Sequence, residues 1–72
     1  QFTVESDKKL NRIKEVLNAQ GRKQSWLADQ LGMSYVAVTR YCNNRQQPTI
    51  PLLVDIARVL DVDVRELLER TK

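Results

Sequence analysis

The sequence of 72 residues contains no histidine and only one cysteine, Cys42. A single cysteine cannot form an intrachain disulfide, and without histidine the chain has too few soft ligands for a structural zinc site. No run of 18 apolar residues occurs and no signal-peptide pattern opens the chain, so neither a membrane span nor secretion is expected. These absences predict a cytoplasmic protein that folds without disulfide or metal.

Groups for catalysis are also missing. The sequence has no nucleophile–base pairing, no cluster of metal ligands and no glycine loop that would cradle a phosphate. We therefore expect no catalytic residue, no metal, no cofactor and no small-molecule ligand. An enzyme is not predicted.

A chain of this length is one small domain, near the size at which a single core only just suffices. Strand-like alternation and internal repeats are absent, whereas apolar residues recur at helical spacing in five segments joined by short loops. We predict an all-α fold of five short helices over residues 6–70. Residues 1–5 are expected to be a flexible N-terminal arm or a cloning remnant.

The first helix is expected to begin at a cap on Ser6 or Asp7 and to stop before Gly21, with Leu10 and Ile13 on its inward stripe. The other four helices are expected over residues 24–31, 35–43, 50–60 and 64–70.

Capping residues set most of these limits. Ser34 and Thr49 are expected to cap the third and fourth helices, and Asp63 with Glu66 forms an acidic variant of the capping box for the fifth. Lys23 lies at the cap position of the second helix, where lysine cannot accept the free backbone N–H groups. That helix start is therefore left available to an anion from outside.

The stretch QSWLADQLGMSYVAVTRYCNN, residues 24–44, reads as a helix that breaks and resumes at once. Two helices joined by a tight glycine-containing turn cross at a steep angle. Ala28 is small where they would cross, Gly32 supplies the turn, and Val38 is placed to insert into the crossing. This spacing is that of a helix-turn-helix.

Charge is unevenly distributed around this broken helix. Residues 22–45 hold four basic side chains and one acidic one, a balance of +3, whereas residues 46–72 hold four basic and five acidic ones, a balance of −1. A basic side and an acidic far end suit a polyanion docking on one face. The alternative is an ordinary solvated surface.

From about residue 10 to residue 69 the chain resembles the Cro/repressor-like (XRE) helix-turn-helix family. The resemblance lies in Gln24 at the start of the second helix, in LADQLG, in Ser34, in NNRQQP and in LLVDIARVLDVDVRELL. It implies a five-helix, lambda-repressor-like DNA-binding domain, commonly dimeric, that regulates transcription.

The chain departs from this family at three positions. Many relatives pair an arginine late in the first helix with a glutamate late in the third, where this chain has Leu17 and Cys42, so we expect an apolar contact there. Asp61 stands where relatives often have the glycine that ends the fourth helix.

Trp26, at the edge of the buried stripe, is expected to pack, covering the seam with Phe2, or else to support a phosphate contact.

The third helix would present one face to DNA if Val38 and Tyr41 point to the core. Arg40 is suited to a bidentate bond with guanine, whereas branched side chains suit thymine methyl groups. A solvated face with no partner is the alternative. The residues predicted to contact bases are Tyr35, Val36, Thr39 and Arg40.

Polar residues on either side of this helix would position it on the DNA backbone. Simple turn chemistry is the alternative for those in the loop after the helix. The residues predicted to contact phosphates are Gln24, Ser25, Ser34, Asn43, Asn44, Arg45 and Gln47.

The predicted function is sequence-specific binding of double-stranded DNA by a transcriptional regulator. A single module of this size buries little surface on DNA, so a homodimer is expected, with contacts near Ile50, Leu52, Leu68 and the last helix. The alternative is a protein-binding module, such as an antitoxin or adaptor, that uses the same fold.

Overall fold

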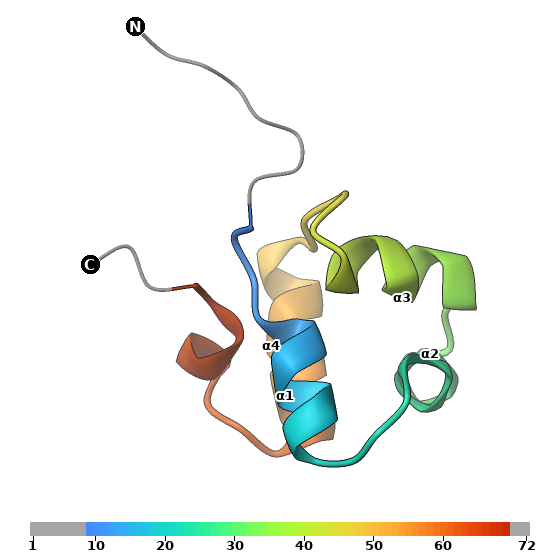
Figure 1. Ribbon diagram of the computed structural model, residues 1–72, viewed down its shortest axis with the longest axis horizontal. Helices are drawn as coiled ribbons and strands as arrows, with labels where there is room; N and C mark the ends of the chain where they lie inside the picture. The colour runs from blue at the N-terminus through green and yellow to red at the C-terminus, as the bar shows by residue number, and fades with distance from the viewer. Residues whose placement is uncertain (1–8, 70–72) are drawn as a thin grey trace, which may run out of the picture.

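The computed structural model describes residues 9–69. Within them the chain forms four α-helices and one 3-10 helix (Figure 1). The expected arm, the caps at Ser6 and Asp7, and the contact of Trp26 with Phe2 depend on residues outside this range. In chain order the elements are α1 (Ile13–Ala19), α2 (Gln24–Leu31), α3 (Tyr35–Cys42), α4 (Ile50–Leu60) and the 3-10 helix η1 (Val64–Leu67).

The first helix begins at Ile13, later than predicted. Residues 10–12 are instead extended and pair with the end of the described chain: the Arg12 N–H donates to Leu67 O at 2.8 Å, and the Glu69 N–H donates to Leu10 O at 2.9 Å. Backbone groups used in this pairing are not available to a helix. Leu10 is accordingly 46% exposed and does not belong to the inward stripe, which corrects the prediction.

The last helix is also shorter than predicted. It is a single 3-10 turn that ends at Leu67, because Leu68 is extended and forms an antiparallel bridge with Asn11. Asp63 caps this turn by accepting the N–H of Arg65 at 2.9 Å, and it binds the Arg65 side chain as well. Glu66 therefore does not complete the predicted capping box. The side-chain hydrogen bond from Arg65 lowers the pKa of Asp63 below its ordinary value.

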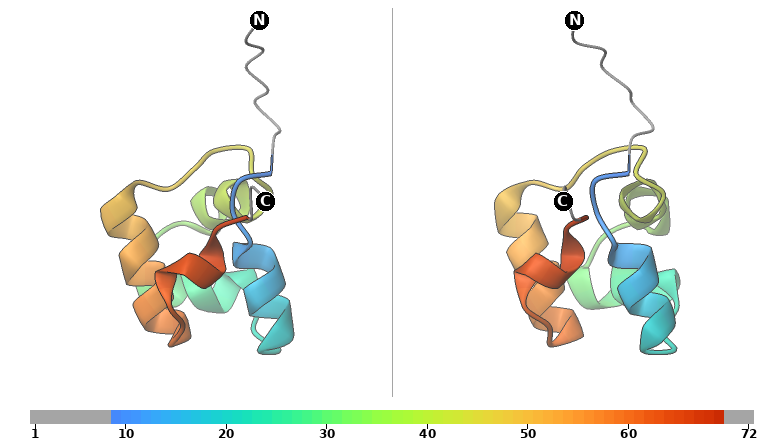
Figure 2. Two further views of the ribbon diagram at one scale, coloured as in Figure 1. Left: turned by 90° about the vertical axis from the view of Figure 1, so that its left-hand side faces the viewer. Right: turned by 60° about the vertical axis from the view of Figure 1, so that its left-hand side comes forward.

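The core lies where all five helical segments meet. Figure 2 shows η1 between α1 and α4, and α2 packs against both α3 and α4. Leu17 and Cys42 are both buried in this core, in agreement with the apolar replacement expected there. The most buried large apolar side chains are Ile13, Leu17, Leu27, Val38, Ile56 and Leu67.

None of the helices within residues 9–69 has the length and apolar character that a membrane crossing requires.

Candidate nucleic-acid interface

The corner between α2 and α3 is built by local signals in the sequence. Gly32 ends α2 with a positive φ of 66°, and the Met33 N–H donates back to Ala28 O at 3.0 Å. A Cβ on Gly32 would meet nothing within 4 Å, so glycine is favoured here by backbone conformation and not by crowding. Ser34 then starts α3 by accepting the Ala37 N–H at 3.1 Å.

The two helices cross steeply, since α2 is seen end-on in Figure 1 where α3 lies across the page. Ala28 and Val38 are both buried, at 3% and 1% exposure, on the two helices that meet here. This is the arrangement predicted from the spacing of Ala28, Gly32 and Val38. It leaves α3 at the edge of the molecule with one side free of the core (Figure 1).

The free side of α3 carries the residues predicted to contact bases. Tyr35 is 56% exposed and Val36 59% exposed, and Arg40 is exposed as well. Thr39 is half-buried, and its hydroxyl donates to Gln24 Oε1 at 3.2 Å. This bond ties the middle of α3 to the start of α2, so Thr39 has a structural contact in addition to its predicted one.

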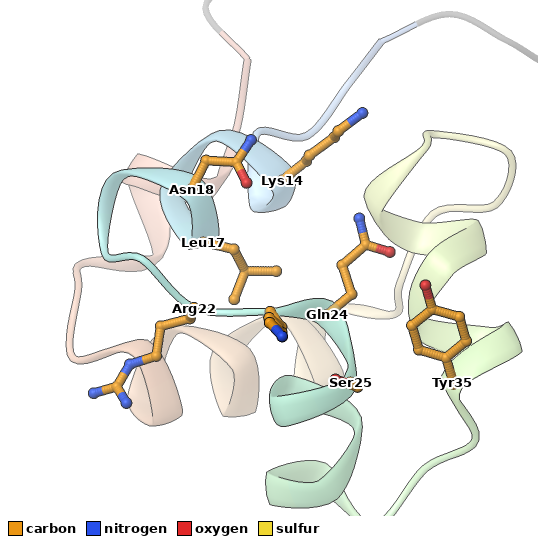
Figure 3. Close-up of a pocket in the computed structure, with 8 residues that line it drawn as sticks. Lys14, Leu17, Asn18, Arg22, Gln24, Ser25 and Tyr35 are labelled. Atoms are coloured by element: carbon orange, nitrogen blue, oxygen red, sulfur yellow. The ribbon is translucent and has the colours of Figure 1, made fainter.

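An open hollow of about 350 Å³ lies beside the start of α2 (Figure 3). Lys23 occupies the N-cap position and forms no side-chain cap, as expected, so its side chain leaves the first N–H groups of α2 uncapped. Gln24, Ser25 and Tyr35 line the hollow, which brings three predicted site residues together. Lys14, Asn18, Arg22 and Lys23 line it as well, and of these Lys14 and Asn18 come from α1, which the sequence did not implicate.

The loop after α3 contains a buried residue, Asn44, that the sequence predicted to contact phosphate. Asn44 is only 6% exposed, and its φ of 58° is left-handed. Its Oδ1 accepts the N–H groups of Leu10 and Asn11 at 2.8 and 2.9 Å, and its Nδ2 donates to Asn11 O at 3.3 Å. The side chain is thus buried and hydrogen-bonded within the protein, which counts against the predicted phosphate contact of Asn44.

Gln47 belongs to the same buried network. Its Oε1 accepts from Asn11 Nδ2 at 2.8 Å, and its Nε2 donates to Asn44 Oδ1 at 3.1 Å. Its side chain therefore holds the loop. Asn11, itself 1% exposed, was missed because nothing around it in the sequence marks it as buried. Asn43 and Arg45 remain exposed.

Trp26 packs as predicted. Its ring lies partly buried against the core, and the Arg22 guanidinium carbon is 4.2 Å above the ring centroid. Such a cation–π contact holds an arginine without neutralising it. The contact therefore holds the Arg22 guanidinium over Trp26, while Arg22 also lines the hollow.

Cys42 packs in the core. It is 2% exposed, and burial raises the pKa of its thiol to about 11 from an ordinary 9.0, although the charge of Lys14 opposes the shift. A thiol held protonated in this way is a poor nucleophile at neutral pH.

The chain forms a steep two-helix corner whose second helix faces outward, with a basic hollow beside it. This arrangement is that of a helix-turn-helix protein. The chain belongs to the XRE-type helix-turn-helix family, because the family model described as "Helix-turn-helix" matches residues 13–67. This is a family of DNA-binding transcription regulators that generally have no enzymatic activity.

Two solved structures that are similar to this chain agree with the family assignment. A protein of Bacteroides fragilis, provisionally described as DNA-binding, is 45% identical, with a TM-score of 0.82 over 83% of this chain and 97% of that one. The restriction-modification controller protein C.AhdI of Aeromonas hydrophila is 25% identical, with a TM-score of 0.70 over 76% of this chain and 83% of that one. None of the curated protein sequences matches this chain.

Proposed function

We propose that this protein binds duplex DNA sequence-specifically as a two-fold dimer, with α3 in the major groove, and thereby regulates transcription. The outward face of α3 is the observation that carries the proposal. Val36 is 59% exposed there, and a β-branched residue on a helix surface costs a few tenths of a kcal/mol relative to alanine. A large apolar side chain in this position gains burial only when a partner covers the face.

The base contacts follow from the chemistry of the face. Arg40 would form a bidentate bond with the O6 and N7 atoms of guanine. Val36 would pack against a thymine methyl group, as would the methyl group of Thr39, because the Thr39 hydroxyl already donates to Gln24. Tyr35 lines the hollow with Gln24, so its hydroxyl suits a phosphate as well as a base edge.

Phosphate contacts on both flanks would fix the docking of α3. Gln24 Oε1 is occupied by Thr39, which leaves the Gln24 NH2 group as the donor to DNA. Ser25 lies beside it, and the Ser34 hydroxyl, which accepts from Ala37, still has its own proton to donate. On the other flank the exposed Asn43 and Arg45 would reach the backbone.

Exposed apolar residues on α4 and after η1 would form the dimer contact. Ile50 is 71% exposed, Val54 39% and Leu68 44%, and Ile50 and Val54 lie one turn apart on the same face of α4. Leu52 packs partly against the core and would contribute less. A two-fold dimer would place its two α3 helices about 34 Å apart, one turn of duplex.

Selection of bound duplexes from random DNA tests this proposal directly, because it returns the recognised motif and the half-site spacing together. Arg40→Ala should then lower affinity for the selected site roughly 5- to 150-fold, as expected for about 1–3 kcal/mol of lost discrimination, with little change on random duplex. Gln24→Ala should weaken both duplexes by the same factor. Arg58→Ala, which removes an exposed arginine on α4, is the control.

Equal losses on selected and random DNA would refute the role of Arg40. Absence of duplex binding even at about 50 mM salt, where phosphate contacts are strongest, would refute the whole proposal. A protein-binding module on the same fold would then be the better interpretation.

A further inference from the structure

We propose that Lys14 of α1 binds a DNA phosphate and joins the two flanks of α3 into one continuous phosphate-binding surface. The proposal rests on the proposed function, and it assigns a DNA contact to a helix outside the helix-turn-helix.

Lys14 is the residue shared by two neighbouring hollows. In the first it lies with Arg22, Lys23 and Gln24 at the start of α2, and in the second with Asn43 at the end of α3. These are the two places where backbone contacts are proposed. In Figure 3 the side chains of Lys14 and Gln24 extend toward the same side, and the Tyr35 hydroxyl is turned toward them. Lys14 therefore lies between the two flanks.

The charge of Lys14 is also free to act on an external anion. Across residues 9–69 no carboxylate lies within ion-pair distance of its ammonium group. Glu15, which lines the second hollow, is paired with Lys9. The first hollow is lined by three cations, Lys14, Arg22 and Lys23, and by no carboxylate. Its field therefore attracts an anion without competition from an acidic neighbour.

The shape of this surface favours a polymer backbone over a small free anion. The two hollows are open and share Lys14, and the lining of the first includes Leu17, a buried apolar side chain that cannot bond an anion. A phosphodiester chain that crosses both hollows can contact Gln24, Lys14 and Asn43 in turn. Successive phosphates on one strand provide such a row of charges.

Arg12, the N-cap residue of α1, provides a control close to Lys14 in the chain. It carries the same charge, but it lines other hollows than Lys14 does, together with Val62, Asp63 and Glu66. Lys14→Gln and Arg12→Gln thus remove one positive charge each, two residues apart in the chain and from different hollows.

The experiment measures the affinity of the full chain for a random duplex of roughly three helical turns and for the selected site, between about 50 and 200 mM salt. Lys14→Gln should lower both affinities by the same factor and reduce the salt slope by about 0.9, so the loss shrinks about 3.5-fold across this range. Arg12→Gln should keep the wild-type slope, and Lys14→Arg should restore it. Thermal unfolding followed by circular dichroism should be unchanged in all three variants, because both side chains are on the surface.

A salt slope of Lys14→Gln equal to that of Arg12→Gln would overturn the proposal. Inorganic phosphate that displaces DNA better than chloride at equal ionic strength would also overturn it, because the hollow would then be a site for a free anion. Wild-type protein that binds no duplex would instead refute the proposed function, so the two failures are distinguishable.

Discussion

Replacement of Asn44 tests whether this residue holds the fold, as the structure indicates, or contacts DNA, as the sequence suggested. Asn44→Ala removes an acceptor for the N–H groups of Leu10 and Asn11, at 2.8 and 2.9 Å, and a donor to Asn11 O. The Asn11 N–H is buried and would be left without a partner, at a cost of about 1–3 kcal/mol. Leu10 is half-exposed, so water would replace part of its lost bond.

The expected sum is a loss of roughly 2–4 kcal/mol in the free energy of unfolding. Alanine adds a further penalty because the φ of residue 44 is +58°. Asn44→Gly loses the same hydrogen bonds without that penalty, so it should be about 1 kcal/mol more stable than Asn44→Ala. For a domain of this size, each kcal/mol corresponds to about 4–8 °C in Tm.

Urea unfolding of the two variants, followed by circular dichroism and by the fluorescence of Trp26, measures these differences. Asn43→Ala is the matched control, because Asn43 is the exposed neighbour and should change stability little. If Asn44→Ala costs less than about 0.5 kcal/mol, or glycine and alanine are equivalent at residue 44, the structural role assigned here is refuted.

Three other substitutions test single features of the fold. Ala28→Leu should overfill the crossing of α2 and α3 and lower the free energy of unfolding in urea by about 1–3 kcal/mol. Asp29→Ala, at the exposed next position, should change it little. Equal effects of the two substitutions would contradict the close crossing. Asp61→Gly should raise the free energy of unfolding by about 0.5 kcal/mol or more, and with it Tm, because residue 61 ends α4 at a φ of 56°. A lower Tm would contradict this. Because folding raises the pKa of Cys42 from 9.0 to about 11, its stabilising contribution is complete below pH 9 and lost as pH rises to about 11. The fall in stability measured by urea unfolding between these pH values should be shallower in Cys42→Ala; an equal fall would show that other groups cause it.

The limits of α2, α3 and α4 could be read from the sequence because each is set by residues next to it. Gly32 accepts the left-handed turn after α2, while Ser34 and Thr49 accept N–H groups three residues ahead. Such signals act within one helical turn and do not depend on the rest of the chain. The exposed face of α3 followed in turn from its helical period.

The two ends of the domain were predicted less well because their partners are distant in sequence. Residues 10–12 have a helical apolar spacing, but their backbone groups bond residues 67–69, which shortens both the first and the last predicted helix. Tertiary pairing of this kind overrides a local preference of a few tenths of a kcal/mol per residue.

The candidate site divides in the same way. The face of α3 and the uncapped start of α2 are properties of single helices, and the sequence revealed them. Lys14 lines the hollow from α1, across a loop. Asn44 is buried because its side chain forms hydrogen bonds with Asn11, 33 residues away. No pattern within one helix encodes either fact.

The sequence by itself determined the helix-turn-helix, since glycine at the corner, serine at the cap and the apolar period are all short-range properties of neighbouring residues. Only the tertiary structure decided which polar side chains face solvent and which are buried in hydrogen bonds. The physical reason is that a polar side chain is satisfied equally well by water or by a protein partner, and the choice depends on what the folded chain places beside it.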